Sequence, residues 1–187
     1  VSMSSVAGTI PEALWVLYQM TFAIITPALM IGAIVERMKF NAVIWFCTLW
    51  MFAVYFPACH MVWGGPGAFF ADMGVLDFAG GIVVHITAGI GALVAAMYLG
   101  ERKENKMHQG NLVLTFLGTA MLWVGWFGFN GGSAGAASAG AAFACLATQL
   151  SASVSAIVWT ALDVLENGKV SVLGTCTASI ALSLIHI

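Results

Sequence analysis

The sequence predicts an all-α membrane protein, a polytopic helix bundle of five transmembrane helices plus the start of a sixth. Composition is the first reason, since 61% of the 187 residues are hydrophobic and 7% are charged. The mean hydropathy of +0.98 lies outside the range of soluble globular domains. The second reason is that the apolar residues gather in five segments, each reaching the roughly 20 residues that a membrane-crossing helix needs. The third is that the basic residues fall only in alternate loops between those segments.

The spans can be placed from the apolar runs and from the breaks between them. The first begins at Pro11, because proline is favoured in the first turn of a helix, and Pro27 predicts a kink within it. Charged or glycine-rich stretches separate the others. The predicted spans are residues 11–35, 41–63, 78–99, 111–130 and 137–165, and a further span begins at about residue 172.

The two ends of the chain bear on its domain organisation. The chain begins without a methionine and ends within an apolar run. We therefore expect residues 1–187 to form a single transmembrane domain that is a fragment of a longer protein.

The loops predict an orientation in the membrane. All six basic residues lie in the loops at 36–40, 100–110 and 166–171, and the opposite loops carry none. They are Arg37, Lys39, Arg102, Lys103, Lys106 and Lys169. By the positive-inside rule that side is cytoplasmic, and the segment before Pro11 lies outside.

The stretch DFAGGIVVHITAGIGAL, residues 77–93, holds an ionisable group deep in an apolar helix. Asp77 is placed to cap the helix start by accepting from free backbone N–H groups. His85, eight residues on, lies about 12 Å along the axis, near the middle of a hydrocarbon layer of about 30 Å. Ionisable groups at that depth usually mark an ion or proton path. The alternative is a buried histidine that joins two helices by a hydrogen bond.

Aromatic residues gather at the predicted outer side. Trp63 precedes a Gly-Gly-Pro-Gly turn, and the stretch GWFGFNGGSAG carries Trp126, Phe129 and Ser133. Aromatic faces attract cations, so this set favours a small monovalent cation. The alternative is lipid packing and anchoring at the membrane interface, where tryptophan is common.

Other classes of protein lack support in the sequence. The four cysteines are far apart with no histidine at ligand spacing, so we expect no metal site, disulfide or cofactor. The scattered basic residues predict no nucleic-acid partner. There is no HExxH, no GxGD, no serine paired with a histidine and no pair of NPA turns, so we expect neither an intramembrane enzyme nor an aquaporin.

The segments DFAGGIVVHITAGIGALVAAMYLG, HMVWGG, GWFGFNGGSAG and GAIVERMKF resemble the ammonium transporter family, which includes yeast and Rhesus relatives. The resemblance covers about Leu14 to Leu173. It implies an eleven-helix fold built from two inverted five-helix repeats plus one helix, of which this chain would cover helices three to seven. It also implies a homotrimer in the plasma membrane, with a cytosolic regulatory protein as a further partner.

The resemblance also implies roles for seven residues. Trp63, Ser133 and Phe22 match the outer site that recruits ammonium, and Phe22 and Phe129 match the two gate rings below it. Asp77 matches the structural acid beside the site. The residues that match the pore lining are His85 and Trp126.

The second pore histidine of the family has no match here. His186 lies in the tail 174–187, which departs from the family pattern and predicts no such role.

The mechanism that the resemblance implies is recruitment of ammonium outside, loss of a proton, and passage of ammonia through an apolar pore. A sensor of the same fold, which reports ammonium to a partner instead of moving it, is the alternative.

Overall fold

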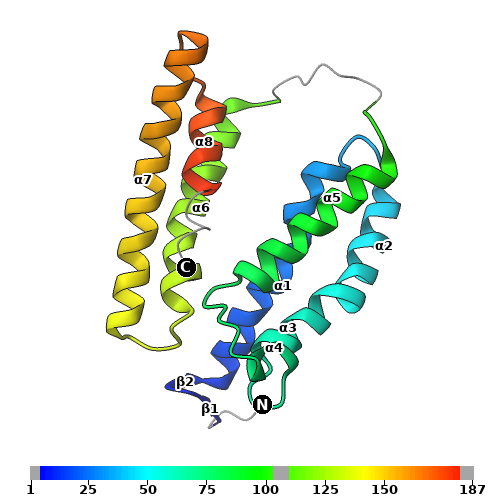
Figure 1. The fold of residues 1–187 in the computed structure, drawn as a ribbon, viewed down its shortest axis with the longest axis vertical. Helices are drawn as coiled ribbons and strands as arrows, with labels where there is room; N and C mark the ends of the chain where they lie inside the picture. The colour runs from blue at the N-terminus through cyan, green and yellow to red at the C-terminus, as the bar shows by residue number, and fades with distance from the viewer. Residues whose placement is uncertain (1–4, 103–109, 182–187) are drawn as a thin grey trace. The chain divides into compact units, whose positions relative to one another are not determined.

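The fold is seen in a computed structural model that describes residues 5–102 and 110–181 (Figure 1). The chain divides between Lys106 and Met107 into two compact units, called here the N-terminal unit and the C-terminal unit. Each is described by itself. Within the described residues, five helices are long and apolar enough to cross a membrane, which agrees with the predicted all-α membrane fold.

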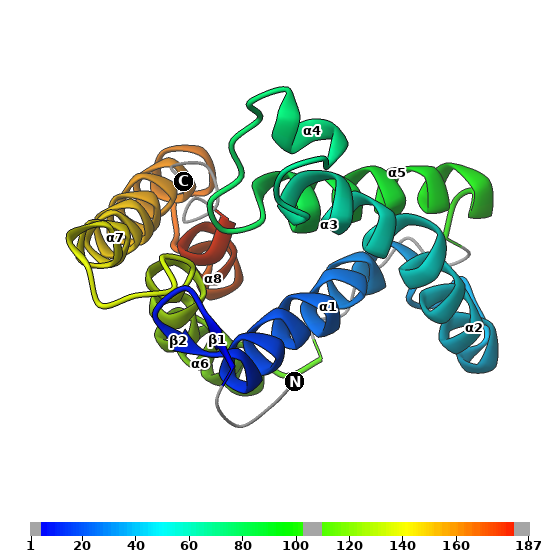
Figure 2. The ribbon, with the colours of Figure 1, turned by 90° about the horizontal axis from the view of Figure 1, so that it is seen from below.

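The N-terminal unit begins with a short antiparallel pair of strands, β1 (Val6–Ala7) and β2 (Ile10–Pro11), in which Val6 lies opposite Pro11. Figure 2 shows this pair at the start of α1 (Glu12–Ile34). The Ser5 hydroxyl donates to the Glu12 carboxylate in the first turn of α1. These strands could not be predicted from the sequence, because two residues per strand leave no hydropathy pattern.

The second span runs continuously from Phe40 to Trp63 as α2 (Phe40–Trp50), η1 (Met51–Tyr55) and α3 (Phe56–Trp63). The η1 segment is a π-helical turn, in which backbone bonds join residues five apart. Pro57, at the start of α3, has no N–H to donate to the preceding turn, which explains why the regular ladder is interrupted there.

A loop with one short helix, α4 (Phe69–Asp72), leads to the third span. This span begins as a second π-helical turn, η2 (Gly81–Ile86), and continues as α5 (Thr87–Leu99). The helix therefore starts three residues later than the predicted residue 78, because residues 78–80 form a bend.

The first and third spans pack closely and run in the same direction. The Phe22 ring lies against Gly80, and further along Met30 lies against Gly91. A Cβ added at Gly91 would lie 2.6 Å from the Met30 sulfur, so any larger residue there would force the buried Met30 side chain to shift. The core between the spans includes Met30, Val83 and Val84, all fully buried.

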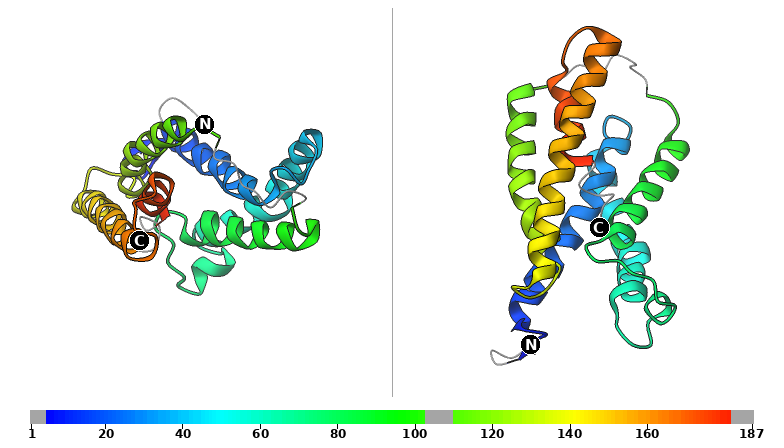
Figure 3. Two further views of the ribbon diagram at one scale, coloured as in Figure 1. Left: turned by 90° about the horizontal axis from the view of Figure 1, so that it is seen from above. Right: turned by 60° about the vertical axis from the view of Figure 1, so that its left-hand side comes forward.

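The C-terminal unit contains α6 (Leu112–Gly132), α7 (Ala139–Asn167) and α8 (Val172–Ala181). These three helices pack against one another in pairs (Figure 3). The side chains of Asn111 and Ser138 cap α6 and α7 by accepting from the backbone N–H three residues on. The helix bounds lie within a few residues of the predicted 111–130 and 137–165, and α8 begins at the predicted residue 172.

Some predictions are not tested by the described residues. Residues 103–109 of the predicted loop 100–110, and residues 182–187 of the tail with His186, lie outside them. The single transmembrane domain over residues 1–187 also stays a prediction.

Candidate functional site

Asp77 organises the start of the third span through its carboxylate. One oxygen accepts from the backbone N–H groups of Gly80 at 2.6 Å and Gly81 at 2.9 Å. The other accepts from Ile82 at 2.8 Å and Val83 at 2.9 Å. The predicted cap is therefore present and engages four N–H groups, which have no carbonyl partner in the first turn of a helix.

His85 lies in the π-helical turn that Asp77 caps. The N–H groups of Val84 and His85 both donate to the carbonyl of Gly80, each at 3.0 Å. Gly80 has a φ of 101°, a conformation that side-chain-bearing residues rarely adopt. The widened turn changes the direction in which His85 leaves the helix relative to a regular α-helix, and π-helical turns are frequent at functional sites.

Trp63 is fixed at the end of the second span by a contact with the same aspartate. Its indole N–H donates to the backbone carbonyl of Asp77 at 2.8 Å. The ring meets Phe22 edge to face, with centroids 5.5 Å apart and planes at 82°. Asp77 therefore holds the tryptophan through its carbonyl and the His85 helix through its carboxylate.

Phe22 is itself held on several sides. It is 1% exposed, and its ring meets Tyr18 edge to face at 5.0 Å. The Thr26 hydroxyl donates to the Phe22 carbonyl at 2.6 Å, one turn along α1. Tyr18 extends the aromatic cluster by one ring, which the sequence analysis missed, although its place one turn before Phe22 was a usable signal.

The C-terminal unit holds the other predicted site residues near the end of α6. Trp126 and Phe129 are stacked, with centroids 5.0 Å apart and planes at 15°. The Ser133 hydroxyl donates to the Phe129 carbonyl at 2.7 Å. A hydroxyl whose proton is engaged in this way offers its oxygen as an acceptor to a further donor.

Asn130 is a buried polar residue beside this set that the sequence analysis did not assign. Its side chain is fully buried, and its amide donates to the Thr148 hydroxyl at 2.8 Å. Thr148 in turn donates to the Ala144 carbonyl within α7. This pair joins α6 to α7, and an amide at the end of an apolar helix could have signalled it.

The structure thus brings the predicted residues together in two sets. In the N-terminal unit Trp63 contacts both Phe22 and Asp77, and His85 lies two turns beyond Asp77 along the chain. Trp126, Phe129 and Ser133 form the second set in the C-terminal unit. The predicted recruitment site combines Trp63 and Phe22 with Ser133, so it draws on both units and stays a prediction.

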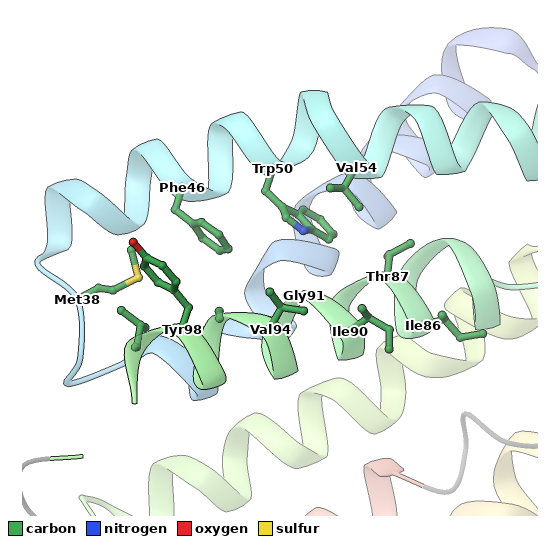
Figure 4. A pocket seen from close by; sticks show the side chains of 12 residues that line it. Met38, Phe46, Trp50, Val54, Ile86, Thr87, Ile90, Gly91, Val94 and Tyr98 are labelled. Carbon is green, nitrogen blue, oxygen red and sulfur yellow. The ribbon is translucent and has the colours of Figure 1, made fainter. Parts of the chain in front are cut away.

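A groove of about 700 Å³ in the N-terminal unit lies between α2 and α5 and is apart from these sets (Figure 4). Its lining is almost wholly apolar and includes Phe46, Trp50, Ile90 and Val94. None of the seven predicted site residues lines it, so we do not assign it to the pathway. Across the described residues, no group of three or more His, Cys, Asp or Glu side chains could hold a metal ion.

Comparison with known proteins places these features in context. The model of the Ammonium Transporter Family matches residues 2–184. A putative ammonium transporter of Methanothermobacter thermautotrophicus is 49% identical over 180 residues, which are 96% of this chain and 44% of that protein. An ammonium transporter of Bacillus subtilis is 44% identical over 176 residues, with coverage of 94% and 43%.

Solved structures agree with the sequence matches. Candida albicans Mep2 superposes with a TM-score of 0.85 at 38% identity and Saccharomyces cerevisiae Mep2 with 0.86 at 37%, each over 94% of this chain. The match covers 40% and 41% of those chains. The chain therefore spans less than half the length of the relatives that it matches.

Proposed function

Because the chain belongs to the ammonium transporter family, we propose that the protein containing it moves ammonium across a membrane. The cation is recruited at an aromatic outer mouth, loses a proton there, and crosses as ammonia past His85. The observation that carries this proposal is the double role of Asp77, which ties the mouth residue Trp63 to the helix that presents His85.

Recruitment uses the chemistry of the mouth residues. The rings of Trp63 and Phe22 supply negative faces, which attract a cation by about 0.5–2 kcal/mol depending on desolvation. Ser133 supplies an acceptor oxygen, since its proton is engaged by the Phe129 carbonyl. Ammonium can donate a hydrogen bond to that oxygen and potassium cannot, so the two ions differ at this site although they are similar in size.

Passage discriminates more strongly than recruitment. Moving an intact cation between the Phe22 and Phe129 gate rings into apolar surroundings costs several kcal/mol or more, about the penalty for burying an uncompensated charge. Potassium meets this cost in full. Ammonium avoids it by leaving its proton outside, and the neutral molecule then needs only a hydrogen-bond partner, which the His85 imidazole provides.

The chain is part of a multi-pass membrane protein, and we place it in the plasma membrane. The described basic residues Arg37, Lys39, Arg102 and Lys169 lie beyond the helix ends on one side by the order of the spans, which supports a cytoplasmic location for that side. A homotrimer and a cytosolic regulatory partner complete the proposal. The size of the full-length protein in detergent tests the trimer.

The full-length protein in proteoliposomes tests the function. An inward ammonium gradient should raise the internal pH, because ammonia that enters takes up a proton inside, whereas an equal potassium gradient should leave it unchanged. Empty liposomes give the background. A protein that binds ammonium with no flux above this background would contradict transport and favour the sensor.

A further inference from the structure

Two arginines cross between the first and third spans of the N-terminal unit. Arg37 follows the end of α1, and its Nη1 donates to the carbonyls of Gly100 at 2.6 Å and Ala96 at 3.4 Å, at the end of α5. Arg102 follows the end of α5, and its Nη2 donates to the carbonyl of Gly32 at 2.8 Å, in the last turn of α1. Each arginine therefore serves the end of the other helix.

The direction of the two helices explains why cations are placed there. α1 and α5 run parallel, so their C-terminal ends lie together, and each end carries partial negative charge from carbonyls without a helical partner. Within α1, the Ile31 and Ile34 carbonyls are served by nearby backbone N–H groups, whereas the Gly32 carbonyl receives Arg102. The crossing supplies charged donors where two negative helix ends meet.

The backbone at the crossing is shaped for these contacts. Gly100 has a φ of 74° and a ψ of −161°, which is open only to glycine, and its carbonyl faces Arg37. Glu36 has a φ of 66°, which is unfavourable for a residue with a side chain. Its carboxylate lies 3.9 Å from Arg102 and is 70% exposed, so this ion pair adds little by itself.

The same two helices carry the site residues at their other ends. Phe22 on α1 lies against Gly80, at the start of the turn that presents His85. Further along the two helices Met30 lies against Gly91, and the two arginines make the contacts at the C-terminal ends. A shift of α1 along α5 would therefore change the height of the Phe22 ring relative to His85.

We propose that Arg37 and Arg102 are positioning residues that fix the axial register of the first span against the third, and thereby the spacing of Phe22 and His85. They touch no transported molecule and act from the far end of both helices. The inference rests on the proposed function for its effect on transport, although the crossing itself is independent of it.

The variants are Arg37→Gln, Arg102→Gln and the pair, in the full-length protein, with uptake normalised to the amount of protein in the membrane. Lys39→Gln is the matched control, since Lys39 is an exposed basic residue of the same loop as Arg37 and has no salt bridge among the described residues.

We expect the maximal ammonium uptake rate to fall by about threefold in each single variant, because the remaining arginine still favours the register. In the double variant it should fall by about tenfold or more. The half-saturating concentration should change less than the maximal rate, because Trp63 keeps its bond to Asp77 and only the Phe22 part of the recruitment site would shift.

Lysine variants separate positioning from general damage. Arg37→Lys and Arg102→Lys keep a charged donor, so each should retain more of the maximal rate than its glutamine counterpart. A lysine variant no better than glutamine, a pair that behaves like Lys39→Gln, or a loss seen only in the half-saturating concentration would overturn the proposal.

Hydrogen exchange provides a readout that does not depend on transport. Arg37→Gln should speed amide exchange at residues 96–100, and Arg102→Gln at residues 31–35, so each change appears on the opposite helix. Exchange that rises only beside the altered residue would contradict the crossing. If the unaltered protein moves no ammonium but the crossed exchange is seen, the proposed function fails and the register role stands.

Discussion

At the scale of single residues, Asp77 holds together the site residues of the N-terminal unit. Its carboxylate engages four backbone N–H groups and its carbonyl engages the Trp63 indole. A carboxylate with four such bonds is fully used as an acceptor. We therefore expect it to act as a fixed part of the scaffold.

The first prediction concerns this carboxylate. In Asp77→Asn one oxygen becomes a donor, which leaves two of the four N–H groups without an acceptor. We expect a loss of about 2–6 kcal/mol in stability, since each of the two groups left unsatisfied costs about 1–3 kcal/mol. Thermal unfolding of the full-length protein in detergent measures this loss.

Asp72→Asn is the matched control, because Asp72 accepts from the Gly67 N–H at 2.9 Å in an exposed loop. It should unfold within a degree or two of the unaltered protein, the range typical of exposed surface substitutions. Equal effects of the two variants would contradict the scaffold role of Asp77.

The second prediction concerns the Trp63 indole. Trp63→Phe keeps an aromatic face but loses the N–H that donates to the Asp77 carbonyl, so the ring is less well oriented. We expect the half-saturating ammonium concentration to rise about threefold, and about tenfold or more in Trp63→Ala, which also loses the cation–π contribution. Phe52→Ala is the control, because Phe52 is an exposed ring in the middle of the same span. Identical values for Trp63→Phe and Trp63→Ala would show that the face does not bind the cation.

At the scale of elements, the helices were predictable and their irregular turns were not. The spans follow from the length of each apolar run, because the bilayer thickness sets that length. The π-helical turns at Met51–Tyr55 and Gly81–Ile86 leave no mark on hydropathy. Pro57 gives a local cause for the first turn, and Gly80 with the Asp77 cap gives one for the second, but the sequence alone does not show that the ladder widens there.

The third prediction tests the close approach of α1 and α5. Gly91→Ala would place a Cβ 2.6 Å from the Met30 sulfur and 3.1 Å from the Trp50 indole nitrogen. We expect a loss of about 1–3 kcal/mol, the usual cost of overfilling a packed core, measured as a lower unfolding temperature in detergent.

Gly89→Ala is the control on the same helix, since nothing lies within 4 Å of the Cβ it would add. That substitution should be neutral or stabilise by about 0.5–1 kcal/mol through helix propensity. If Gly91→Ala were as well tolerated as Gly89→Ala, the close packing of these spans would be refuted.

At the scale of the whole molecule, charge and hydropathy predicted the number and order of spans. They could not predict the long-range hydrogen bonds that hold the site residues. Trp63 and Asp77 are fourteen residues apart and meet across an irregular loop, so their hydrogen bond could not be inferred from spacing. The crossed arginines likewise join residues more than sixty apart. Family motifs predicted the site residues, whereas the fold shows how those side chains are held within each unit.

His85 provides the most direct test of whether the transported species crosses without its charge. The measurement is the ratio of ammonium to potassium uptake in proteoliposomes of the full-length protein, for the unaltered protein, His85→Ala and the control His60→Ala, whose histidine lies in the last turns of the second span. We predict a high ratio for the unaltered protein and for His60→Ala, with little change between them. For His85→Ala we predict that ammonium uptake is lost or that the ratio falls toward one. Uptake and ratio unchanged in His85→Ala would contradict passage of ammonia past this imidazole.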